Sequence, residues 1–318
     1  MSALSLAYSP CPNDTYIFHA WVHGLVPGAP RVREVLADID ELNAMALRAE
    51  PDVVKVSFHA LAHLRERYVL LHSGGALGRG CGPLVLVTPE SPLRLANGGG
   101  PSRVLAGRRV AIPGELTTAA LLLRLYAPEV GEMVPMPFHR IMGSVRRGEV
   151  DAGVIIHEGR FTYVQQGLRS LLDLGDWWEG VTGRPIPLGG IVVRRDLGPD
   201  VARRVDDAVR RSLEVARADP EASTAYIRRH AQEMDPKVCR EHIALYVTDF
   251  SIDYGDEGEG AIRHLLAQAE VLGAVPDSGD RPLFWDDPAA MGFRADGPVG
   301  PAGADGPDGA DGPGGADR

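Results

Sequence analysis

Cysteine is scarce in this 318-residue chain, which holds only Cys11, Cys81 and Cys239. Three cysteines so far apart in sequence give neither a disulfide framework nor the closely spaced pairs of a zinc site. No run of apolar residues approaches the roughly 18 that a membrane helix needs. The first residues also have no basic region and no small-residue cleavage site after an apolar stretch, which a signal peptide would have. We therefore expect a cytoplasmic protein with free thiols and no membrane contact.

Positive charge is also in short supply. The formal net charge is −10, whereas a nucleic-acid partner needs a basic face to bind phosphates. The composition, with 44% hydrophobic and 24% charged residues, is that of a globular protein long enough for two lobes. The sequence thus predicts no nucleic-acid partner, and it does not reveal the oligomeric state.

The C-terminal residues 295–318 differ in kind from the rest, because glycine falls at every third position from 297 to 315. This period is typical of a collagen-like triplet repeat, but the triplets are few and many of them lack proline. The segment has almost no apolar area to offset the entropy of ordering. We expect a disordered tail and keep the triple helix as the alternative.

Strand and helix patterns alternate along the remaining chain. Strands are expected at 3–7, 32–39, 52–56, 69–72, 84–88, 110–112, 133–137, 152–156 and 188–193. Helices are expected from the first loop to residue 24 and at 41–47, 59–67, 117–126, 139–147, 199–218, 222–230, 237–246 and 259–272. Such alternation predicts an α/β protein with mostly parallel sheets.

Small polar or ionisable residues follow four of these strands, where ligands bind in parallel sheets. They are Asn13 with Asp14, Ser57, Thr117 with Thr118, and His157. Helix capping alone would account for several of them. The threonine pair opens a helix, and a helix N-terminus binds anions well. Because no P-loop lysine is present, a carboxylate fits this position better than a nucleotide.

Among the ten histidines, His157 is the most informative, because it ends a buried strand and exchanges protons near neutral pH. A structural histidine at a strand end is the alternative. Five histidines lie on expected helices among charged neighbours, and we expect them at the surface: His23, His63, His230, His242 and His264. The pattern does not exclude a functional role for four others, which are His19, His59, His72 and His139. No histidine spacing predicts a metal site.

Several segments are long and unusual in composition. They are SPCPNDTYIFHA at 9–20, KVSFHA at 55–60, LGRGCGPL at 77–84, PG at 113–114 with TT at 117–118, IHEGRFTY at 156–163, and DLGDWWE at 173–179 with PIPLGG at 185–190. In these segments the chain resembles the 1,4-dihydroxy-6-naphthoate synthases of the futalosine route to menaquinone, from the first strand to about residue 272.

The resemblance implies the two-lobed fold of type II periplasmic binding proteins, with a ligand cleft between α/β lobes. Lobe one would comprise residues 1–88 and 190–290, and lobe two residues 89–189. The family's catalytic base matches His157, and its substrate contacts match Lys55, Val56 and Ser57 and the pair Thr117 and Thr118. Asp14 and Asn43 are further expected cleft contacts. The resemblance assigns no role to Cys11.

The implied reaction is a carbon–carbon lyase step that converts cyclic dehypoxanthinylfutalosine, a small carboxylate, to 1,4-dihydroxy-6-naphthoate without metal or cofactor. Two alternatives share the fold. One is chorismate dehydratase of the same pathway, which the SPCPND and IIHEGR segments disfavour. The other is a solute-binding protein of a transporter, which would be exported.

Overall fold

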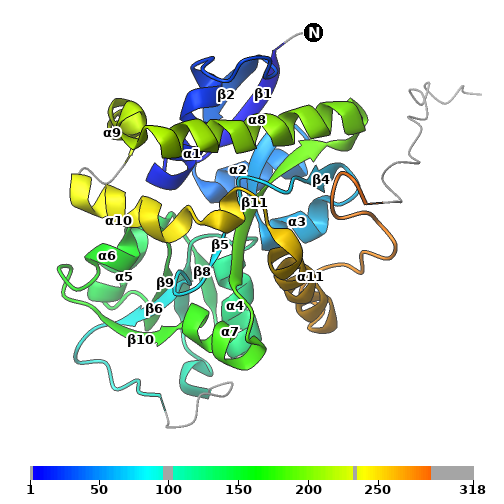
Figure 1. The fold of residues 1–318 in the computed structure, drawn as a ribbon. Coiled ribbons are helices and arrows are strands. Elements are labelled where there is room, and N and C mark those ends of the chain that lie inside the picture. The colour runs from blue at the N-terminus through cyan, green and yellow to red at the C-terminus, as the bar shows by residue number, and fades with distance from the viewer. Residues whose placement is uncertain (1–2, 96–102, 232–234, 288–318) are drawn as a thin grey trace, which may run out of the picture.

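The strands form two separate sheets, each flanked by helices (Figure 1), in a computed structural model that describes residues 3–95, 103–231 and 235–287. The first sheet has the order β2-β1-β3-β11-β4, with β5 paired to β11, and the second has the order β10-β6-β9-β7-β8. The first contains β1 (Leu4–Tyr8), β2 (Val32–Leu36), β3 (Val53–Ser57), β4 (Tyr68–Leu70), β5 (Ala76–Gly78) and β11 (Ile186–Arg194). The second contains β6 (Leu84–Val87), β7 (Val110–Ile112), β8 (Met133–Pro135), β9 (Ala152–Ile155) and β10 (Arg169–Asp173).

Helices cover both faces of each sheet. Around the first sheet are α1 (Pro12–Val22), α2 (Ile39–Leu47), α3 (Phe58–Leu64), α8 (Pro199–Ala218), α9 (Thr224–His230), α10 (Pro236–Tyr246) and α11 (Gly255–Val271). Around the second are α4 (Thr118–Tyr126), α5 (Phe138–Arg146), α6 (Gly159–Thr162) and α7 (Leu174–Thr182). On the first sheet α1 and α8 share one core with β1, whereas α2, α3 and α11 share the other. No helix among the described residues has the length and apolarity to cross a bilayer.

The predicted fold class is confirmed, but the sheets are mixed rather than mostly parallel. In the first sheet β11 runs antiparallel to β3, β4 and β5, and in the second β6 runs antiparallel to β9 and β10. The chain enters β6 from one sheet and β11 from the other. Neither strand therefore belongs to a strand–helix–strand unit within its own sheet, which is the unit that imposes parallel pairing.

The sheet division also differs from the expected lobe boundary at β6, which we had placed with residues 1–88. It pairs with β9 and β10, so residues 84–87 belong to the second sheet. The return to the first sheet, expected near residue 190, begins at Ile186. Residues 79–83 and 183–185 thus connect the sheets. The expectations for the loop at 97–102 and the tail at 295–318 lie outside the described residues.

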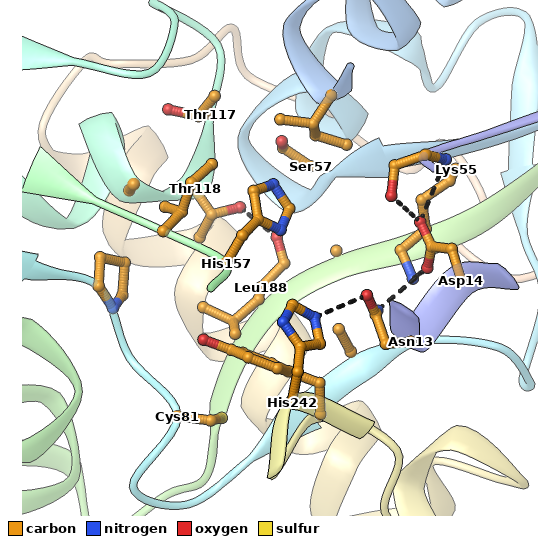
Figure 2. Close-up of a pocket in the computed structure, with 18 residues that line it drawn as sticks. Asn13, Asp14, Lys55, Ser57, Cys81, Thr117, Thr118, His157, Leu188 and His242 are labelled. Carbon is orange, nitrogen blue, oxygen red and sulfur yellow. Dashed lines mark hydrogen bonds and ion pairs between the residues drawn. The ribbon is translucent and has the colours of Figure 1, made fainter. Parts of the chain in front are cut away.

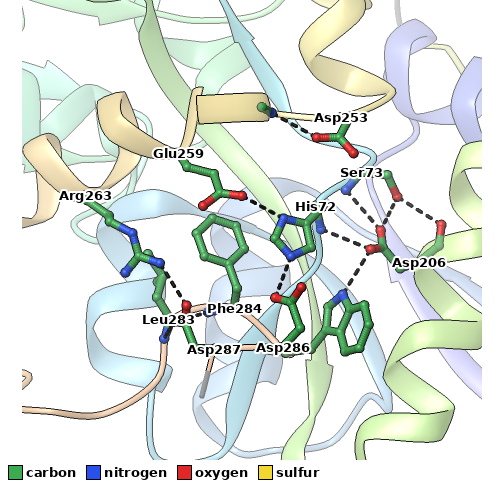
Figure 3. Close-up of polar contacts among 12 residues, drawn as sticks. His72, Ser73, Asp206, Asp253, Glu259, Arg263, Leu283, Phe284, Asp286 and Asp287 are labelled. Carbon is green, nitrogen blue, oxygen red and sulfur yellow. Dashed lines mark hydrogen bonds and ion pairs between the residues drawn. The ribbon is translucent and has the colours of Figure 1, made fainter. Parts of the chain in front are cut away.

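A segment beyond α11 is fastened back onto the first sheet around His72 (Figure 3). The backbone N–H of Leu70 donates to the carbonyl of Leu283 at 2.9 Å. The His72 ring lies between Glu259 at 2.9 Å from Nδ1 and Asp286 at 2.7 Å from Nε2. It stacks on Phe284 at 4.6 Å between ring centroids. A protonated His72 ring can donate to both carboxylates, because both nitrogens of an imidazolium carry a proton.

His72 should make stability depend on pH. Burial by itself lowers the pKa of His72, but the bond to Asp286 and the nearby carboxylates of Asp206 and Glu259 more than offset this, and the pKa is raised. A raised folded-state pKa contributes stability below the ordinary value of about 6.5, and that stability is lost as pH rises through the folded-state pKa. We expect His72→Gln to lower the free energy of unfolding most at mildly acidic pH.

The measurement is urea unfolding of both proteins over a pH series that extends well above the ordinary histidine value. The difference between their free energies of unfolding should become smaller as pH rises. A difference that stays constant with pH would mean that His72 acts through packing on Phe284 rather than through its charge.

Candidate functional site

A pocket lies where residues from the two sheets meet (Figure 2). It contains all of the polar residues predicted from the strand ends. Its polar lining residues from the first sheet and its helices are Ser9, Asn13, Asp14, Lys55, Ser57 and His242. Those from the second sheet and its helices are Thr117, Thr118 and His157. The convergence of strand ends that the sequence predicted is therefore present.

A buried ion pair joins Asp14 at the start of α1 to Lys55 on β3. Side chains alternate along a strand, and Val54 and Val56 belong to the core on the α3 face. Lys55 therefore points to the opposite face, toward α1, where its Nζ lies 3.0 Å from Asp14 Oδ1 and 3.1 Å from the carbonyl of Gly74. The Ser9 hydroxyl donates to the other Asp14 oxygen at 2.7 Å. Each charge thus has hydrogen-bond partners within the protein.

Ser57 lines the pocket, and Asn43 holds it in place. Asn43 holds Ser57 twice, since its Oδ1 accepts from the Ser57 backbone N–H at 3.0 Å and its Nδ2 donates to the Ser57 Oγ at 3.1 Å. Because the Oγ is already an acceptor, its own proton is directed elsewhere. Asn43 and Val56, both expected to contact substrate, do not line the pocket: Asn43 positions Ser57, and Val56 packs in the core.

Thr117 and Thr118 open α4 as predicted, but their hydroxyls are used inside the protein. Thr117 caps the helix, accepting from the N–H of Ala120 at 3.2 Å and donating to the carbonyl of Gly114 at 2.7 Å. Thr118 donates to the carbonyl of Leu188 on β11 at 2.6 Å. An anion at this position would therefore meet the first N–H groups of α4 rather than the two hydroxyl protons.

His157 follows β9 and adopts a left-handed backbone conformation with φ of 56°. For a residue other than glycine this conformation costs about 1–3 kcal/mol and is concentrated at functional sites. Its Nδ1 lies 3.4 Å from Cys11 Sγ, and Phe138 packs against its edge at 5.1 Å. Burial lowers the pKa of His157 to about 4. The ring is thus neutral near pH 7 and able to accept a proton.

The expectation for His242 was wrong: it is buried and lines the pocket. Its charged neighbours Arg240 and Glu241 suggested a surface position. The buried residues of α10 are Val238, Cys239, His242 and Tyr246. Their spacing is that of one helix face, and this periodicity could have identified the histidine as buried. Burial, reinforced by His157, holds the pKa of His242 well below its usual range.

Three donor atoms beside the pocket could hold a metal ion, although the sequence predicted none. They belong to Cys11, His157 and Glu158 and lie within 4.8 Å of one another. Thiolate, imidazole and carboxylate are a set that zinc accepts. Burial and the carboxylate of Glu158 raise the pKa of the Cys11 thiol. A metal would therefore have to displace the thiol proton.

The fold defines the class to which this pocket belongs. An alkanesulfonate-binding protein from Xanthomonas axonopodis pv. citri matches with a TM-score of 0.64 at 14% identity, over 89% of this chain and 96% of that chain. Two sheets with a pocket at their junction thus make this a protein of the periplasmic-binding-protein-like fold.

Sequence comparison is more specific. A family model described as menaquinone biosynthesis matches residues 4–271. The chain is 53% identical to a 1,4-dihydroxy-6-naphtoate synthase from Streptomyces coelicolor, over 89% of this chain and 98% of that protein. It is 49% identical to a synthase of the same name from Thermus thermophilus, over 89% and 100%. A solved structure from Archaeoglobus fulgidus matches at 34% identity and a TM-score of 0.78, over 86% and 98%. The chain belongs to the menaquinone biosynthesis family.

The buried ion pair of Asp14 and Lys55 should contribute to the stability of the fold. Lys55→Met would leave the Asp14 carboxylate buried without its counter-charge, and breaking a buried pair from one side costs about 3–5 kcal/mol. The free energy of unfolding in urea should fall by that amount. Asp14→Asn in the same chain should restore part of it, because the unpaired charge is removed.

Lys237→Met is the matched control, since Lys237 forms an exposed ion pair with Glu241 and exposed pairs contribute little. It should leave the free energy of unfolding almost unchanged. If Lys55→Met were equally harmless, the pair would not be a structural element of the site.

Proposed function

We propose that this chain is a carbon–carbon lyase that converts cyclic dehypoxanthinylfutalosine to 1,4-dihydroxy-6-naphthoate. The proposal rests on its membership of the menaquinone biosynthesis family and on the two synthases that match nearly their full length. The observation that carries it further is a neutral, strained histidine facing a pocket between two sheets. We also propose that the enzyme works in the cytoplasm without metal or organic cofactor.

His157 is the proposed general base. Cleavage of the carbon–carbon bond begins with removal of a proton from a substrate hydroxyl, and the electrons of the broken bond pass into the ring system that becomes aromatic. A positioned base contributes roughly 10²–10⁴-fold to such a step. The lowered pKa keeps the ring unprotonated near pH 7. A pocket shielded from water by the two lobes would also protect the charged intermediate from side reactions.

The substrate carboxylate is proposed to lie at the start of α4, beside Ser57. The first N–H groups of that helix and the Ser57 hydroxyl are potential donors that line the same pocket. Fixing the carboxylate here fixes the distance between the reacting hydroxyl and His157. We propose that the first sheet with its helices forms lobe one and the second sheet forms lobe two, and that they close over the substrate.

A single assay separates this function from its alternatives. The purified protein is incubated with the cyclic futalosine and, separately, with chorismate, and product formation is followed by absorbance. Release of 1,4-dihydroxy-6-naphthoate supports the proposal. Turnover of chorismate alone would make the chain a chorismate dehydratase, and binding of either compound without turnover would make it a solute-binding protein.

In the same assay, His157→Asn should reduce turnover to below about a hundredth of the wild-type rate, since a base contributes at least that much. Substrate binding should stay within a few fold, because the amide keeps part of the ring's shape. If the variant retained more than a tenth of the activity, another residue would be the base, and His59, next to Thr117, would be tested first.

Ser57→Ala should raise KM for the carboxylate substrate about tenfold, the value of one hydrogen bond to a charged group. An analogue without the carboxylate should bind both proteins alike. Asn43→Leu should have the same signature, because it removes the two bonds that orient Ser57. Equal weakening of both ligands would place the carboxylate elsewhere in the pocket.

A further inference from the structure

The hydrogen bonds around His242 determine which of its ring nitrogens carries the proton. Asn13 Nδ2 donates to Asp14 Oδ1 at 3.1 Å, because the Asp14 carboxylate, paired with Lys55, can only accept. The opposite end of that amide, Asn13 Oδ1, therefore faces His242 Nε2 at 3.0 Å and must accept from it. The His242 proton thus sits on Nε2, and Nδ1 carries a lone pair.

That lone pair accepts no hydrogen bond from the described part of the chain. Nδ1 of His242 is buried and meets no hydrogen-bond donor there. A protonated ring would bury a second N–H without an acceptor, whereas the neutral ring with its proton on Nε2 leaves Nδ1 as an acceptor. A buried acceptor without a partner costs about 1–3 kcal/mol, and native proteins retain few of them. The residue therefore carries a cost that a ligand could remove.

The place of the ring shows where such a ligand would lie. His242 borders the pocket, and its ring is nearly parallel to that of His157, with 6.3 Å between centroids (Figure 2). Tyr246, one turn further along α10, packs on the same ring at 4.7 Å. One histidine comes from a helix of the first sheet and the other follows a strand of the second. Nδ1 itself is buried, so the contact that we propose below requires the two sheets to move apart enough to admit a ligand.

We propose that His242 is a binding residue that accepts a hydrogen bond at Nδ1 from a hydroxyl group of the substrate. This inference rests on the proposed function and adds a contact on the pocket wall formed by α10. Its partner is a neutral donor, because a carboxylate would offer only lone pairs to an acceptor. His242 therefore selects a hydroxyl and orients the molecule relative to His157, while the network through Asn13, Asp14 and Lys55 keeps its proton on the far nitrogen.

Two substitutions of His242 test the roles of its two ring nitrogens separately. In His242→Gln the amide nitrogen reaches the place of Nε2, so the bond to Asn13 is kept and the acceptor at Nδ1 is lost. In His242→Asn the amide oxygen occupies the place of Nδ1, so the acceptor is kept and the bond to Asn13 is lost. Both variants replace the imidazole ring by an amide. Their melting temperatures are compared to check that both are folded.

The experiment measures kcat and KM of both variants and the wild type with the cyclic futalosine, and then binding of analogues that each lack one hydroxyl. His242→Gln should raise KM about tenfold with kcat within a few fold, and His242→Asn should stay within about threefold of the wild-type KM. For one deoxy analogue the difference between wild type and His242→Gln should vanish, which identifies the hydroxyl.

The outcomes distinguish this inference from the proposed function. If the wild type turns the substrate over but the two variants lose affinity equally, the His242 contact is wrong and the function stands. The same conclusion follows if every deoxy analogue still separates wild type from His242→Gln. If the wild type neither binds nor converts the substrate, the proposed function fails and the inference fails with it.

Discussion

The ion pair between Asp14 and Lys55 is the interaction on which the site depends. Two opposite charges this deeply buried need further hydrogen bonds to offset their loss of hydration, and here Ser9, Asn13 and the Gly74 carbonyl supply them. The pair joins the helix after the first strand to the centre of the first sheet. It also orients Asn13, and through Asn13 it sets the protonation of His242. One electrostatic requirement thus organises a whole wall of the pocket.

The facing wall is organised by backbone geometry instead of charge. His157 is held in a left-handed conformation at the end of β9, and the hydroxyls of Thr117 and Thr118 are committed to the start of α4 and to β11. The two walls belong to different sheets, and in the described parts of the chain the backbone passes from one sheet to the other only at residues 79–83 and 183–185. A site divided in this way couples the position of His157, the proposed base, to the arrangement of the two sheets. Any relative movement of the two sheets would therefore change the distance between His157 and the groups on the opposite wall.

Much of this could be predicted from the sequence, and the exceptions have physical causes. Strand β7 is a short apolar run and helix α8 has a strong helical periodicity, and both were predicted with the observed bounds. The short β5 was hidden in a glycine-rich stretch, and β10 with α7 lay in a segment where we expected no element. Long-range pairing, rather than local propensity, makes β5 and β10 strands. His157 was predicted by position and resemblance, whereas His242 required the face of α10 to be known.

The central place of β11 has a consequence for how the protein is made. This strand lies between β3 and β4 in the first sheet, yet it is synthesised after every strand of the second sheet. The second sheet is contiguous in sequence from β6 to β10 and can close on its own contacts as it leaves the ribosome. Until residue 194 has emerged, β3 and β4 of the first sheet lack the strand that pairs between them. The lobe that begins the chain is therefore the last to be completed, and exposed β3 is the segment on which a chaperone would be expected to act during that interval.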